Sequence, residues 1–120
     1  MSLKSEFKVD PRVCVVGLGY VGLPLAVALG AKFKVLGYDK DAMRIQELEN
    51  FYDRTAEITE FQLRSTKVKF SDDELELENC DIFVVTLPTP VDEANQPDTS
   101  YIREANTLIS KYIKKGTIVI

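Results

Sequence analysis

The 120-residue sequence contains no histidine and no tryptophan. The absence of histidine excludes Ser-His and Cys-His nucleophile pairs, HExxH metal sites and imidazole pH switches. The two cysteines, Cys14 and Cys80, are too few for a disulfide framework, or for a four-ligand zinc site without histidine. We therefore interpret both thiols as small buried apolar side chains in a reducing compartment, and we predict no metal site.

Long apolar runs are also absent. No stretch approaches the ~18 consecutive apolar residues typical of a membrane-spanning helix, and the polar leader at 1–11 does not resemble a secretion signal. Acidic residues outnumber basic ones by 19 to 15, and the resulting net charge of −4 argues against a nucleic-acid partner. These features predict a cytoplasmic protein that contacts neither membrane nor nucleic acid.

The chain is long enough to bury one modest core, so we expect a single domain over 1–120. Runs typical of strands alternate with helical patterns. Strands are expected at 12–16, 34–38, 68–70, 82–86 and 117–120, and helical segments at 20–32, 41–49, 60–65, 72–78 and 101–113. Strands separated by crossover helices pair in parallel. The sequence thus predicts an α/β fold, a doubly wound parallel (Rossmann) sheet with strand order 3-2-1-4-5, cut short in its fifth strand.

A glycine-rich turn joins the first expected strand to the first expected helix. It reads Gly17-Leu18-Gly19-Tyr20-Val21-Gly22, a G-x-G-x-x-G pattern in the context that dinucleotide binding requires. The first glycine permits a tight turn, the second lets a pyrophosphate approach the backbone, and the third lets the helix pack closely on the sheet. A pyrophosphate would rest on free N–H groups at the positive end of the helix. We expect all six residues to contact a cofactor, with a ligand-free turn as the alternative.

Asp39 ends the second expected strand, about 20 residues after the glycines, where a carboxylate can accept hydrogen bonds from adenosine ribose. The same charge would repel a 2′-phosphate, so Asp39 favours NAD over NADP. Lys40 and Arg44 weaken this preference, because a nearby cation can accommodate a 2′-phosphate. A solvated turn residue is the alternative interpretation of Asp39, and we expect NAD as the cofactor.

The loop after the fourth strand is expected to form the opposite wall of the site. In the order 3-2-1-4-5, strands one and four are neighbours whose connections leave in opposite directions, and ligands bind in the crevice between them. Candidate cofactor contacts in this loop are two hydroxyls and two rigid prolines, Thr86, Pro88, Thr89 and Pro90. The spacing of these residues fits equally well a rigid connecting loop that makes no contact with a cofactor.

Together these segments resemble the UDP-glucose/UDP-N-acetylhexosamine 6-dehydrogenases, the nucleotide-sugar dehydrogenase family. Residues 16–26 are similar to the opening segment of the family. Asp39, with Lys40 and Arg44, resembles the group of residues that contacts the adenosine ribose in the family, and residues 86–90 resemble the family's second cofactor loop. Residues 53–57 resemble the Asp-x-Thr-x-Glu run of the branch that acts on UDP-N-acetylhexosamines. The glycine that the family has shortly before this run is absent here, where 50–52 reads Asn-Phe-Tyr.

The resemblance implies NAD-dependent oxidation of a UDP-sugar C6 alcohol to a carboxylate, with a cysteine thiolate that traps the aldehyde. Neither Cys14 nor Cys80 matches the position of that nucleophile, so we assign no catalytic residue and expect a fragment that binds NAD without turnover. A homodimer is compatible with an exposed sheet edge. The alternatives are a stand-alone NAD-sensing module and the cofactor domain of another dehydrogenase, of the hydroxyacyl or phosphogluconate type.

Overall fold

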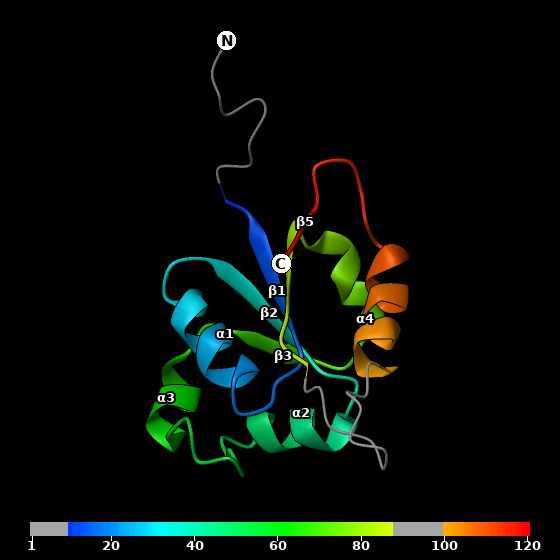
Figure 1. Ribbon diagram of the computed structural model, residues 1–120. Coiled ribbons are helices and arrows are strands. Elements are labelled where there is room, and N and C mark those ends of the chain that lie inside the picture. Colours follow the sequence, from blue (N-terminus) through cyan, green and yellow to red (C-terminus); the bar gives the residue numbers. More distant parts are fainter. Residues whose placement is uncertain (1–9, 88–99) are drawn as a thin grey trace.

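The computed structural model describes residues 10–87 and 100–120. Their parallel strands form one sheet in the order β3-β2-β1-β4-β5 (Figure 1). The strands are β1 (Arg12–Val16), β2 (Lys34–Tyr38), β3 (Lys69–Ser71), β4 (Ile82–Val85) and β5 (Ile118–Val119). The central strand β1 places Val13 opposite Val35 of β2 and opposite Ile82 of β4. The predicted doubly wound order is confirmed.

Helices connect the successive strands. They are α1 (Gly22–Gly30), α2 (Ala42–Glu49), α3 (Glu60–Ser65), the 3-10 helix η2 (Glu74–Asn79) and α4 (Ser100–Ser110). The expectation for α1 was too long at both ends, because the backbone up to Val21 forms the glycine turn and the helix ends at Gly30. The expectation for α4 was one residue late at its start and too long at its end, because the helix runs from Ser100 to Ser110. Among the described residues, no helix has the length and apolarity needed to cross a bilayer.

Side chains of β1 alternate between two buried clusters, as the period of two in a strand requires. Val13 and Val15 pack into a cluster with residues of α1, α2 and α3. Cys14 and Val16 pack into a second cluster with residues of η2 and α4. Figure 1 accordingly shows α1 and α4 on opposite sides of the sheet. A strand buried on both faces reads as a continuous apolar run, which explains the sequence of β1.

Candidate cofactor site

A cavity of about 440 Å³ opens at the carboxyl ends of β1, β2 and β4. Four segments line it: the glycine turn after β1, the end of β2, the start of the loop after β4, and one face of α4. Gly17, Asp39, Thr86 and Ala105 represent these four segments. This is the crevice at which the connections of β1 and β4 diverge, where ligands bind in open α/β sheets.

The three glycines of the turn meet different local demands. Gly17 has a φ of +97°, a conformation that favours glycine, and its N–H donates to the carbonyl of Tyr38 at 2.8 Å. A Cβ added to Gly22 would lie 1.9 Å from the carbonyl oxygen of Gly17, so no side chain fits there. A Cβ added to Gly19 would meet nothing within 4 Å. The backbone at Gly19 therefore has open space beside it, as an approaching pyrophosphate would require.

Thr86 ties the loop after β4 to the glycine turn. Its hydroxyl donates to the carbonyl of Gly17 at 2.7 Å, and its backbone N–H donates to Val16 at 2.9 Å. Since the hydroxyl proton points at the turn, a cofactor contact from Thr86 would use its oxygen as an acceptor. The other candidate contacts of this loop, Pro88, Thr89 and Pro90, lie outside the described residues.

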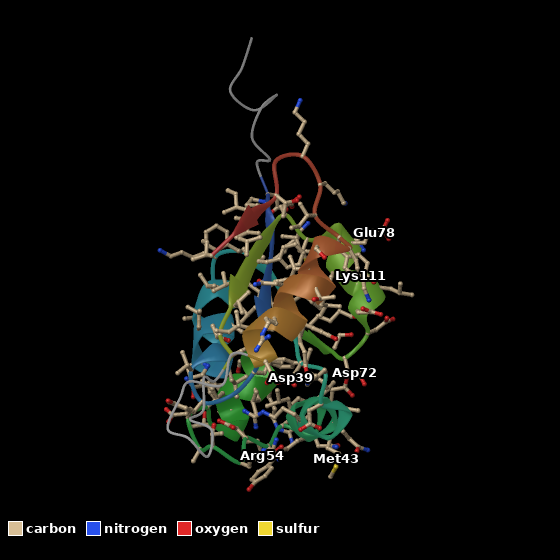
Figure 2. The ribbon with its side chains drawn as sticks, turned by 45° about the vertical axis from the view of Figure 1, so that its right-hand side comes forward. Asp39, Met43, Arg54, Asp72, Glu78 and Lys111 are labelled. Atoms are coloured by element: carbon tan, nitrogen blue, oxygen red, sulfur yellow. The ribbon has the colours of Figure 1, made fainter. Side chains whose placement is uncertain are left out.

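The backbone holds the carboxylate of Asp39 in place. Oδ2 accepts a hydrogen bond from the N–H of Leu18 at 2.9 Å, and Oδ1 accepts one from the N–H of Asp41 at 2.9 Å. Asp39 is half-buried at the cavity wall, and Figure 2 shows it near the end at which α4 begins. A carboxylate offers about four lone-pair positions, so two anchoring bonds leave capacity for ribose hydroxyls. Direct binding of ribose by Asp39 stays a prediction.

Arg44 lies behind the glycine turn instead of lining the cavity. Asp41 caps α2 by accepting from the N–H groups of Met43 and Arg44, which fixes the start of the helix that carries Arg44. The guanidinium is buried, and its Nε donates to the carbonyl of Leu18 at 2.8 Å. Arg44 thus supports the turn from its far side, and its predicted contact with ribose stays a prediction.

Asp53 is the partner of Arg44, a role that sequence reasoning missed. Its side chain is fully buried, with Oδ1 3.0 Å from Nη2 of Arg44. The carboxylate also accepts hydrogen bonds from Thr55 and from the N–H of Ile58. Burial alone would raise the pKa of Asp53, but the hydrogen bonds from Thr55, Ile58 and Arg44 outweigh it and lower the pKa to about 2. An Asp two residues before a Thr is a recognisable turn pattern, but the sequence does not show that it pairs with Arg44.

Lys40 follows Asp39 and reaches across the cavity to α4. Its Nζ lies 2.5 Å from Oε2 of Glu104, and both side chains are largely exposed. Both residues line the same cavity as the glycine turn. The ion pair therefore joins the end of β2 to α4 beside the expected position of the ribose.

The two cysteines lie in the second buried cluster, away from the cavity lining. A hydrogen bond to Cys80, together with burial, raises the pKa of Cys14, and the same hydrogen bond lowers the pKa of Cys80. Neither sulfur has the exposure that a nucleophile needs. Within residues 10–87 and 100–120, no cluster of three or more Cys, Asp or Glu side chains could hold a metal ion.

Comparison with known families supports this geometry. The model for the UDP-glucose/GDP-mannose dehydrogenase family, NAD binding domain, matches residues 11–120. The chain belongs to this family. NAD is the cofactor of the domain, which confirms the cofactor predicted from the glycine turn and Asp39. The NAD-sensing module and the other dehydrogenase types are not favoured.

Individual relatives agree with this assignment. Protein CapL from Staphylococcus aureus is 44% identical over 109 residues, which cover 91% of this chain and 26% of CapL. The UDP-N-acetyl-D-glucosamine 6-dehydrogenase of Pseudomonas aeruginosa is 46% identical over 112 residues, covering 92% of this chain and 26% of that enzyme. The solved UDP-D-ManNAc dehydrogenase of Pyrococcus horikoshii superimposes with a TM-score of 0.83 at 26% identity, over 90% of this chain and 27% of that one. The chain thus spans about a quarter of the length of these relatives.

Proposed function

We propose that this chain is the NAD-binding part of a UDP-N-acetylhexosamine 6-dehydrogenase, which oxidises the C6 alcohol of its sugar to a carboxylate. The observation that carries the proposal is the cavity in which open backbone space at Gly19 faces the anchored carboxylate of Asp39. The substrate class follows from relatives named as UDP-N-acetyl-D-glucosamine and UDP-N-acetyl-D-mannosamine dehydrogenases.

We assign the residues of the cavity to parts of the cofactor. The backbone around Gly19 would face the pyrophosphate, and Asp39 would accept hydrogen bonds from the adenosine ribose. Thr86, at the start of the loop after β4, lines the same cavity and would face the nicotinamide half. NAD, when bound, supplies the hydride acceptor. This chain's part is to bind and orient it, and we assign no catalytic residue here.

Calorimetry with NAD and NADP tests the binding proposal directly. The chain is expected to bind NAD with micromolar to millimolar affinity and to lose this binding in Asp39→Ala and Gly19→Val. Glu60→Gln is the matched control, because Glu60 pairs with Arg64 on exposed α3, outside the cavity lining. Tighter binding of NADP than of NAD would contradict the assigned role of Asp39.

The substrate proposal requires a turnover assay. A protein of the relatives' length that includes this chain is expected to form two NADH for each UDP-N-acetylhexosamine consumed, with UDP-glucose as the weaker substrate. The 120-residue chain alone is expected to form none. NADH production by the chain alone would contradict the absence of a catalytic residue.

We further propose a cytoplasmic location and a homodimeric assembly. The support for the location is the pair of buried free thiols, which suits a reducing compartment. The support for self-association is the exposed apolar edge at Ile118, Val119 and Ile120. Sedimentation velocity tests the assembly, and a purely monomeric protein at micromolar concentration would contradict it.

A further inference from the structure

Two cations lie near the expected position of the adenosine ribose, and the structure pairs both with carboxylates. Arg44 is buried against Asp53 and donates to the carbonyl of Leu18, so its charge is compensated behind the glycine turn. Lys40 is the second cation, next in sequence to Asp39 and exposed at the cavity. Of the two, only Lys40 lines the cavity in which a 2′-phosphate would lie.

Glu104 compensates the charge of Lys40 from the opposite wall. It belongs to α4, whereas Lys40 follows β2, so the ion pair of 2.5 Å joins two segments that line the same cavity as Asp39. With both cations paired, the Asp39 carboxylate decides the sign of the local potential. That sign is negative, which suits a ribose hydroxyl and repels a phosphate dianion.

We propose that Glu104 is a specificity-determining residue that excludes NADP by holding the ammonium group of Lys40. The proposal rests on the proposed NAD site, and it adds to that site a residue on a different element from Asp39. A purely structural role for this pair is small, because ion pairs between exposed side chains stabilise proteins little. Both side chains are about 60% exposed, at 63% for Lys40 and 59% for Glu104. The effect of the pair should therefore appear in cofactor choice more than in stability.

The test is the ratio of the dissociation constants for NADP and NAD, measured by calorimetry on the 120-residue chain at low ionic strength. Glu104→Gln removes the carboxylate that holds the ammonium group of Lys40, and it is expected to shift the ratio toward NADP by about two- to fivefold, the size of one exposed ion pair. The control Glu60→Gln removes the same charge and breaks a comparable exposed pair on α3, and it is expected to leave the ratio unchanged. An unchanged ratio in Glu104→Gln would overturn the proposal.

A double-mutant cycle with Lys40→Gln separates the ion pair from the simple loss of a negative charge. If Glu104 acts by holding Lys40, the shift caused by Glu104→Gln disappears when Lys40 is also replaced. If the shift persists in the double variant, Glu104 acts only through its own charge and the proposed mechanism is wrong. Failure of the wild-type chain to bind NAD would count against the proposed function instead. Unfolding curves of all four proteins confirm that each variant is folded.

Discussion

Arg44 and Asp53 form an ion pair in which Nη2 lies 3.0 Å from Oδ1, and both side chains are shielded from solvent. The same guanidinium donates from Nε to the carbonyl of Leu18 in the glycine turn. The loop after α2 therefore supports the cofactor cavity through one buried arginine. Because breaking a buried pair leaves an uncompensated charge, each partner should matter more than an exposed charge would.

Asp53→Asn is expected to lower the free energy of unfolding by about 3 kcal/mol, because the buried Arg44 loses its closer counter-ion and keeps only Glu47, whose Oε2 lies 3.7 Å from Nη1. NAD affinity should fall as well, since a displaced guanidinium no longer holds the carbonyl of Leu18. Urea unfolding and calorimetry measure the two effects. The matched control is Glu57→Gln, which removes an exposed charge from the same loop and should change neither quantity. Equal stability of the two variants would show that the pair contributes nothing.

The pH dependence of stability should carry the signature of Asp53. Its pKa is about 2 in the folded chain, against an ordinary value of 3.8. The ionised carboxylate therefore stabilises the fold fully at pH values above the ordinary pKa. That contribution, about 2 kcal/mol, is lost as the pH falls from about 5 toward 2. The stability difference between wild type and Asp53→Asn should therefore narrow over this range, as followed by urea unfolding at successive pH values. A difference that stays constant down to pH 2 would contradict the lowered pKa.

The sequence predicted the sheet order and the position of the cavity because both depend on local signals. The apolar run of β1, the glycine turn and Asp39 follow one another along the chain, and parallel topology brings their carboxyl ends together. The partners of Arg44 and Lys40 could not be predicted in this way. Asp53 and Glu104 reach these cations through tertiary packing of a loop and of α4, and no periodicity marks such contacts.

At the end of α2, Phe51 occupies a left-handed position that usually holds glycine. The N–H of Phe51 donates to Leu48 and the N–H of Tyr52 to Glu47, the bonding pattern that closes many helices on a left-handed glycine. Here Phe51 occupies that position with a φ of +62°, which is strained for an aromatic residue. Its ring packs against the first buried cluster and under the guanidinium of Arg64, 4.2 Å from the centroid. These contacts offset the strain and explain why the chain tolerates the absence of glycine here.

Phe51→Gly and Phe51→Ala form a matched pair that isolates the backbone strain. Both variants lose the ring contacts, but only glycine adopts the positive φ without a Cβ clash. We expect Phe51→Gly to be more stable than Phe51→Ala by about 1 kcal/mol, the reverse of the usual order of these residues. Thermal or urea unfolding measures the difference. If Phe51→Ala is the more stable of the two, the left-handed conformation is not strained.

Gly19→Ala and Gly22→Ala should separate cofactor binding from folding within one turn. A Cβ at Gly22 would lie 1.9 Å from the carbonyl of Gly17 and 2.4 Å from the hydroxyl of Thr86, so Gly22→Ala should lose about 3 kcal/mol of stability or fail to fold. A Cβ at Gly19 meets nothing within 4 Å, so Gly19→Ala should unfold like wild type.

The methyl group of Gly19→Ala would nevertheless occupy the space that a pyrophosphate needs, and NAD affinity should fall by about tenfold or more, equivalent to about 1.4 kcal/mol. Unfolding curves and NAD calorimetry on both variants measure the two effects side by side. Wild-type NAD affinity in Gly19→Ala would place the pyrophosphate elsewhere in the cavity, and wild-type stability in Gly22→Ala would contradict the close packing of α1 on the turn.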